Sequence, residues 1–146
     1  MNQAIEEFIA GKHIALVGAT QNPKKFGNAL LIELKARGYK VEPIHPTAIE
    51  IAGQPCYPSL AALPGKVDGV LICVKPAQVE DVLRQAANAG IKRVWLVQGA
   101  ESAAALRLGK ELGLTVVSGK CILMYAPPVK SIHSFHRFFV KLTGQY

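Results

Sequence analysis

The sequence has few charged, aromatic and cysteine residues, and each shortage excludes a class of protein. Only 18% of its 146 residues are charged and 50% are hydrophobic, which excludes a disordered or fibrous chain. The cysteines are odd in number and widely spaced, so Cys56, Cys73 and Cys121 predict neither a disulfide framework nor a zinc site. Aromatic residues are scarce before the last dozen positions and the basic residues are scattered, which argues against a nucleic-acid-binding module.

Long apolar runs are also lacking. No run approaches the length of a membrane span, and the first residues carry acids where a signal peptide carries bases. We therefore expect one cytoplasmic domain that neither crosses nor binds a membrane. The net charge of +7 favours an anionic partner, but charge alone does not choose among nucleic acid, a membrane surface and a polyanionic metabolite.

Recognisable catalytic and metal motifs are missing as well. The sequence shows no Ser-His-Asp set, no nucleophile elbow and no metal-binding pattern. His133 and His136 stand three residues apart but have no acidic or sulfur ligand beside them. We therefore expect no catalytic residue and no bound metal.

What the sequence does have is a repeated junction in which a glycine separates a helical pattern from a β-rich run. Gly11, Gly38, Gly90 and Gly113 occupy such positions. Glycine readily takes the left-handed conformation that ends a helix, so each junction predicts a helix end followed by a strand start. An alternating β/α chain follows. Its expected strands are His13–Val17, Lys40–Ile44, Val67–Val74, Arg93–Val97 and Thr115–Ser118.

This alternation predicts the fold class. Amphipathic patterns indicate helices at residues 2–10, 77–89 and 102–112, whereas the breakers between Ile44 and Val67 leave room only for a turn of helix after Ser59. Right-handed crossovers then give an α/β, Rossmann-like, doubly wound sheet of five parallel strands, most simply in the order 3-2-1-4-5. The ligand crevice of such a sheet lies between the loops after its first and fourth strands.

An extra C-terminal helix is expected beyond this core. Residues 131–142 carry an apolar stripe and several basic side chains. We therefore divide the chain into a core of residues 1–128 and a helical extension of the same domain, residues 129–146. The extension could pack across the sheet, contact a second copy of the chain or another protein partner, or lie on a membrane surface.

The first strand runs directly into the turn Gly18-Ala-Thr-Gln-Asn-Pro-Lys-Lys-Phe-Gly-Asn28, which precedes a helical pattern. A tight strand-to-helix turn aims unpaired N–H groups and the helix dipole at one spot, which suits an anion. Lys24 and Lys25 lie at the helix start, where the dipole disfavours each cation by roughly 0.3–1 kcal/mol. A bound phosphate would reverse that penalty. The alternative, that both lysines point into water and the turn only connects, stays open.

The nucleotide is not expected to be NAD. The turn lacks the Gly-x-Gly-x-x-Gly fingerprint, and the second strand ends without the acid that would hold the ribose. Glu42 lies inside that strand and not at its tip. NADP, which favours positive charge there, is less clearly excluded, so an NADP-dependent or other nucleotide-using enzyme remains an alternative.

Several segments carry a resemblance when they are taken together and in order. They are GATQNPKKFG at 18–27, GYKVEPIHP at 38–46, IAGQPCYPSL at 51–60, VDGV at 67–70 and VWLVQG at 94–99. This series resembles the small stand-alone CoA-binding proteins of bacteria and archaea, relatives of the nucleotide-binding domain of the succinyl-CoA synthetase α subunit. The resemblance covers roughly residues 5–125. It implies a Rossmann-like domain that binds coenzyme A or an acyl-CoA as a non-catalytic binder, sensor or carrier.

The resemblance also implies where the ligand lies. The first turn would hold the phosphates, the loop after the third strand would border the adenine, and the loop after the fourth would lie near the pantetheine or pyrophosphate. Cys121 would lie on the ligand edge, either forming a mixed disulfide with the CoA thiol or serving as a small buried hydrophobic residue, whereas Cys73 is expected in the core. The implied site residues are Gly18, Ala19, Thr20, Lys24, Lys25, Phe26, Gly27, His45, Pro46, Val74, Lys75, Pro76, Gln98, Gly99 and Cys121.

Overall fold

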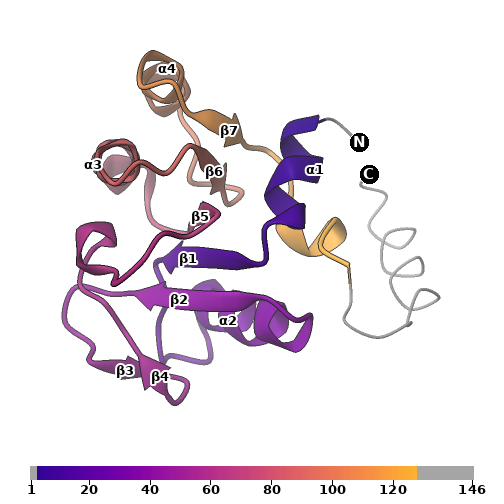
Figure 1. Ribbon diagram of the computed structural model, residues 1–146, viewed down its shortest axis with the longest axis vertical. Helices are drawn as coiled ribbons and strands as arrows, with labels where there is room; N and C mark the ends of the chain where they lie inside the picture. Colours follow the sequence, from indigo (N-terminus) through magenta and orange to yellow (C-terminus); the bar gives the residue numbers. More distant parts are fainter. Residues whose placement is uncertain (1–2, 128–146) are drawn as a thin grey trace.

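The computed structural model describes residues 3–127, which form a parallel β-sheet with helices on both faces (Figure 1). All neighbouring strands in this sheet run parallel. The predicted five-stranded, Rossmann-like α/β fold is therefore confirmed. In spatial order the strands are β2 (Lys40–Ile44), β1 (His13–Val17), β5 (Gly69–Ile72), β6 (Arg93–Leu96) and β7 (Thr115–Val117).

The predicted strand order, 3-2-1-4-5, is wrong in one respect. The third predicted strand, β5, pairs with β1 and does not lie beyond β2. Two features of the sequence explain this arrangement. Pro43 lies within β2 and has no N–H to donate to a further strand, which favours an edge position. All residues of β5 are buried, as a central strand covered on both faces requires.

The two faces of the sheet bury separate apolar layers. Ile14 and Leu16 of β1 pack with α1 (Gln3–Ala10) and α2 (Phe26–Ala36) on one face. Ala15 and Val17 point to the other face, which is covered by α3 (Pro76–Asn88), α4 (Ala103–Glu111) and the short 3-10 helix η1 (Leu60–Ala62). Because successive side chains of a strand alternate, one continuous apolar strand supplies both layers.

All four glycine junctions separate a helix from a strand as predicted, and the left-handed conformation is confirmed at three of them. Gly38, Gly90 and Gly113 have φ values of 91°, 78° and 75°, the left-handed conformation that ends a helix. Gly11 has a different reason to be glycine. A Cβ there would lie 2.6 Å from the Cβ of Asp68, so a close approach between two chain segments excludes a side chain.

One hairpin was not predicted. β3 (Glu50–Ile51) and β4 (Gln54–Pro55) pair antiparallel in the stretch rich in proline and glycine. Their two-residue turn has positive φ at both Ala52 and Gly53, the mirror-image geometry that suits hairpins. The Gln21 side-chain amide donates to the Glu50 carbonyl, so the hairpin is attached to the turn after β1.

The segment 120–126, here called the strap, follows β7 and contains the 3-10 helix η2 (Ile122–Met124). The Arg37 guanidinium donates to the carbonyl oxygens of Leu123 at 2.7 Å and Ala126 at 2.9 Å. The Trp95 indole N–H donates to the Lys120 carbonyl at 2.9 Å. Three hydrogen bonds thus anchor the strap to the core. The predicted C-terminal helix, with His133 and His136, lies outside the described residues.

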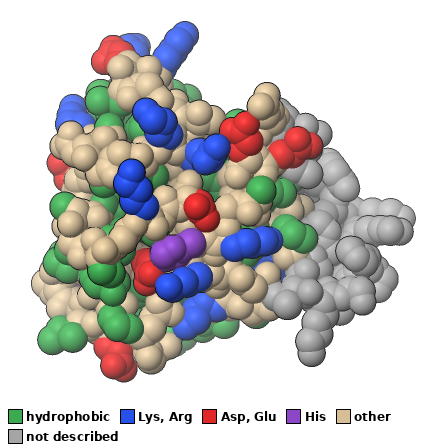
Figure 2. Space-filling model, viewed as in Figure 1, with side chains coloured by type: hydrophobic (Ala, Val, Ile, Leu, Met, Phe, Trp, Pro, Cys, Tyr) green, Lys and Arg blue, Asp and Glu red, His purple; other side chains and the backbone are tan. Residues whose placement is uncertain are grey.

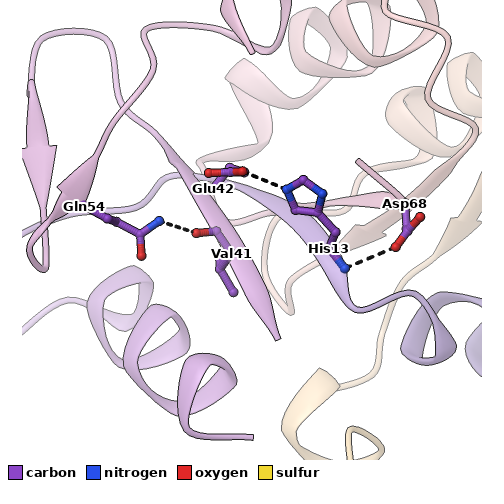
Figure 3. A network of polar contacts seen from close by, with 5 residues as sticks. All are labelled: His13, Val41, Glu42, Gln54 and Asp68. Carbon is purple, nitrogen blue, oxygen red and sulfur yellow. Dashed lines mark hydrogen bonds and ion pairs between the residues drawn. The ribbon is translucent and has the colours of Figure 1, made fainter. Parts of the chain in front are cut away.

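A polar network joins the amino ends of the first strands (Figure 3). The His13 ring nitrogen Nε2 lies 2.7 Å from Oε2 of Glu42, and the His13 backbone N–H donates to the Asp68 carboxylate at 3.1 Å. The Gln54 amide donates to the Val41 carbonyl at 2.6 Å. The Glu42 side chain therefore contacts His13 and lies toward the amino ends of the strands, away from the loops that follow them.

Candidate functional site

The candidate site lies where β1 and β5 end. β2 and β5 flank β1, and the connections from β1 and β5 leave toward opposite faces of the sheet, which makes this the topological switch point. The loops that meet there follow β1 and β5. The prediction placed the switch point between the first and fourth strands, and that detail is wrong because β5 lies between β1 and β6. The loop after β6 nevertheless takes part in the site, because Phe26 and Gln98 line the same spaces.

Two glycines let the loop after β1 pack tightly. Gly18 has a φ of 101°, and a Cβ there would lie 2.0 Å from the Cys73 carbonyl oxygen. A Cβ on Gly27 would lie 2.2 Å from the Gly18 carbonyl oxygen. Strand β1, its loop and the first turn of α2 therefore close against β5 with no space for a side chain at either position.

The loop after β1 is held in shape by its own polar groups. The Thr20 hydroxyl accepts the Asn22 N–H at 3.1 Å, and the Asn22 side chain accepts the Lys24 N–H at 2.9 Å. The Asn28 amide donates to the Thr20 carbonyl at 2.9 Å. Ala19 is 1% exposed and packs in the apolar core. These bonds preorganise the turn.

The helices that begin at the switch point have open N-termini. α2 follows Lys25 and α3 follows Lys75, and neither lysine provides a side-chain cap. Pro76 at the first turn of α3 confirms the predicted helix start. By contrast, α4 is capped, because the Ser102 hydroxyl accepts the Ala105 N–H at 3.0 Å. The positive dipole ends of α2 and α3 therefore have no side-chain acceptor at the switch point, which leaves them suited to an anion.

Three exposed lysines surround these helix starts. Lys24 and Lys25 precede α2, and Lys75 precedes α3. Among residues 3–127, no acidic side chain lies within ion-pair distance of any of them. Their charge therefore adds to the helix dipoles without internal neutralisation.

A cleft of about 280 Å³ adjoins the helix starts. It lies between Phe26, the loop after β5 and the loop after β6, and so brings the predicted adenine-bordering and pantetheine-bordering residues into one space. Its lining residues are Phe26, Cys73, Val74, Lys75, Pro76, Val97, Gln98, Gly99 and Ala100.

A smaller recess lies next to this cleft, on the other side of Phe26. It has about 10 Å³ of free space and lies between α2, the end of β6 and the strap. Phe26, Val97 and Gln98 line both spaces, so the two adjoin and together form the crevice at this edge of the sheet. The recess is lined by Phe26, Leu30, Val97, Gln98, Lys120, Cys121 and Ile122, so predicted site residue Cys121 lies at its wall.

His45 and Pro46 line neither space. They follow β2, which adjoins β1, and the Gly18 N–H donates to the Ile44 carbonyl at 3.4 Å. The His45 Nδ1 atom accepts the backbone N–H groups of Thr47 at 3.2 Å and Ala48 at 3.0 Å. The ring therefore shapes its own loop beside the turn, and no acid stands at the tip of β2.

Cys73 is a residue that the sequence prediction placed wrongly. It was expected in the core of a strand, but β5 ends at Ile72, and Cys73 is half-buried and lines the cleft. Burial raises the pKa of its thiol above the ordinary value. The apolar run Val70–Val74 gave no signal of where the strand would end.

The loop after β6 is less suited to phosphate than the helix starts. The Gly99 N–H donates to the Glu101 carboxylate at 3.1 Å, so a negative charge already occupies this donor. Pantetheine and pyrophosphate were both predicted near Gln98 and Gly99. The uncharged pantetheine fits the neighbourhood of the Glu101 carboxylate better than the negatively charged pyrophosphate.

Charge on the rest of the surface is mixed. Figure 2 shows lysine and arginine side chains spread over one face of the molecule with acidic side chains among them. Within residues 3–127, no cluster of three or more His, Cys, Asp or Glu could hold a metal ion. No helix in the same range is long and apolar enough to cross a membrane.

The sheet order and the glycine turn define a Rossmann-like α/β domain with its crevice at the carboxyl edge. The chain belongs to the CoA binding domain family, whose sequence model matches residues 12–127. The resemblance stated from the sequence is thereby confirmed, and CoA binding is the general property of this domain.

Three relatives show the size of the similar region. A conserved hypothetical protein from Pyrococcus furiosus has a similar structure, with a TM-score of 0.74, 40% identity, and coverage of 76% of this chain and 96% of that one. YneT of Bacillus subtilis is 28% identical over 111 residues, 76% of this chain and 82% of YneT. The alpha subunit of ADP-forming acetate–CoA ligase II from Pyrococcus furiosus is 26% identical over 129 residues. That match covers 81% of this chain but only 28% of the subunit.

Proposed function

We propose that this chain binds CoA at the carboxyl edge of the sheet, with the phosphates at the open N-termini of α2 and α3, and does not transform it. The observation that carries the proposal is the contrast in helix capping. The two helices beside the switch point are preceded by lysines without a side-chain cap, whereas α4 has a serine cap. Uncapped helix starts with added cations suit a polyphosphate.

The charges of CoA match this arrangement. CoA carries a pyrophosphate and a 3′-phosphate, and a phosphate monoester bears roughly −1.5 to −2 at neutral pH. Lys24, Lys25 and Lys75 supply three exposed positive charges around the helix starts. Lysine acts as a point charge toward phosphate and needs no fixed geometry, so exposed side chains are adequate.

The crevice suits the remaining parts of the ligand. In the proposed complex, the adenine lies against Val74, Lys75 and Pro76 in the cleft. The pantetheine arm follows the loop after β6, where the Gln98 amide can hydrogen-bond its amide groups. Phe26, at the first position of α2, offers an apolar surface between the two.

We propose a binder, sensor or carrier because the crevice lacks an activated group among the described residues. Burial raises the pKa of the Cys73 thiol, so it stays protonated at neutral pH and is a poor nucleophile. The Glu101 carboxylate is already bonded to the Gly99 N–H. The chain spans less than a third of the ADP-forming ligase subunit, so ligase activity is not proposed for it alone.

A thermal-shift comparison of CoA, dephospho-CoA, NADP, NAD and ATP tests the proposal. A ligand that binds the native state stabilises it by mass action and so raises the melting temperature. At a ligand concentration of a hundred times its Kd the stabilisation is roughly 2.7 kcal/mol. CoA is expected to give the largest shift, and dephospho-CoA, which lacks the 3′-phosphate, a smaller one. A larger shift with NADP than with CoA would favour the nucleotide-using enzyme instead, and no shift with CoA at saturating concentration would contradict the proposal.

A further inference from the structure

We infer that Phe26 and the strap select free CoA over its acyl thioesters, because the recess between them has room for the ligand's thiol but not for an acyl chain. The inference rests on the proposed function, since it concerns the end of the ligand opposite the phosphates. It assigns a specificity-determining role to Phe26, beyond CoA binding as such.

The size of the recess limits which part of the ligand it can hold. Its free space is about 10 Å³, against about 280 Å³ in the adjoining cleft. A cavity needs at least about 10–15 Å³ on this measure to hold one water molecule. The recess therefore holds one small group, the size class of a thiol, and an acyl chain fits inside it only if a wall residue moves.

The position of the recess suits the thiol end of the ligand. The phosphates are placed at the start of α2, and Phe26 is the first residue of that helix. Phe26, Val97 and Gln98 line both spaces, so the recess is the next space that an arm leaving the phosphates through the cleft meets beside Phe26. The recess wall is largely apolar, with Leu30 and Ile122 buried, which suits a neutral thiol.

The walls of the recess differ in how easily they can move. Leu30 belongs to the packed face of α2, and the strap is fixed by the hydrogen bonds from Arg37 and Trp95. Phe26 is 46% exposed, so its ring can swing outward without breaking core contacts. Acyl length is therefore limited by Phe26, and the cost of forcing extra carbons falls on its displacement.

Isothermal titration calorimetry with CoA, acetyl-CoA, butyryl-CoA and octanoyl-CoA tests this inference. The wild-type protein is expected to bind CoA best and to lose affinity as the chain lengthens, by about tenfold or more for octanoyl-CoA. Equal affinity for CoA and octanoyl-CoA would overturn the inference while leaving CoA binding intact. Failure of CoA itself to bind would instead overturn the proposed function.

The variant Phe26→Ala assigns the selectivity to one side chain. Removing the ring joins the recess to the cleft, so the ratio of CoA to octanoyl-CoA affinity is expected to fall to about threefold or less. Phe26→Leu should give an intermediate ratio. Ile32→Ala, which removes an exposed apolar side chain elsewhere on α2, is the matched control and should keep the wild-type ratio. An unchanged ratio in Phe26→Ala, with wild-type melting behaviour, would overturn the role of Phe26.

Discussion

A Cβ atom on Gly18 would lie 2.0 Å from the carbonyl oxygen of Cys73, so these two residues bring the ends of β1 and β5 into direct contact. The contact fixes the floor between the two loops of the switch point. It also explains why the turn after β1 needs a glycine twice over, for its φ of 101° and for the missing side chain.

Gly18→Ala is therefore expected to be severely destabilising. The clash is with backbone and cannot be relieved by a rotamer change, so the free energy of unfolding should fall by about 3 kcal/mol or more. Gly113→Ala is the matched control, because Gly113 also has positive φ but a Cβ there meets nothing within 4 Å. The control should lose only about 1–2 kcal/mol in urea denaturation. Equal losses in the two variants would contradict the packing described.

The stability of the fold should fall at alkaline pH because of Tyr39. Burial raises the pKa of this phenol to about 12, with Arg37 acting in the opposite direction, and the hydroxyl donates to the Ile9 carbonyl at 2.6 Å. The folded state thus favours the neutral phenol. Its contribution is fully present below the unfolded pKa of about 10 and is lost as pH rises toward about 12, by up to roughly 2–3 kcal/mol.

The measurement for Tyr39 is the free energy of unfolding between pH 8 and pH 12 in wild-type protein and Tyr39→Phe. The variant loses a hydrogen bond, so it should start about 1 kcal/mol lower at pH 8. Its decline above pH 10 should be shallower than that of the wild type. Parallel curves would show that Tyr39 does not cause the alkaline loss.

Cys121 is expected to form a mixed disulfide when the protein meets oxidised CoA. In this exchange the Cys121 thiolate attacks CoA disulfide, one CoA thiol leaves, and the protein retains the other half. Cys121 lies at the wall of the recess, whereas burial raises the pKa of Cys73 and lowers its thiolate fraction. Intact-mass analysis should show one CoA adduct that disappears in Cys121→Ser and persists in Cys73→Ser. An adduct unaffected by Cys121→Ser would contradict this prediction.

The strands and the glycine turn could be predicted because their signals are local. The runs that became β1 and β2 were predicted with their observed bounds, and the helical pattern expected after the glycine turn became α2, with Gly27, Leu30, Leu31 and Leu34 buried. The strand order was not predicted correctly. The link from β2 to β5 has no full crossover helix, so helical periodicity could not show on which side of β1 the chain returns.

The candidate site was only partly accessible to sequence reasoning for the same reason. Phe26, Gln98 and Cys121 were among the expected residues, and the structure places them around one recess. Cys73 was missed because an apolar run does not reveal which of its last residues is only half-buried and lines the cleft. The strap could not be foreseen either, since Arg37 reaches its carbonyl acceptors across 86 and 89 positions of the chain.

We propose that the lysine-flanked helix starts at the switch point hold the phosphates of CoA. Calorimetry with CoA on wild-type protein and on the triple variant Lys24→Ala, Lys25→Ala and Lys75→Ala tests it most directly. The control is Lys40→Ala, Lys66→Ala and Lys92→Ala, which removes the same net charge from exposed positions toward the opposite edge.

We expect the first triple variant to bind CoA roughly 10- to 100-fold more weakly than the wild type, and added salt to narrow the difference. The control variant should stay within about threefold of the wild type, because its charges lie farther from the ligand than a Debye length of about 8–10 Å. Equal loss in both triple variants, or unchanged affinity in the first, would contradict the account.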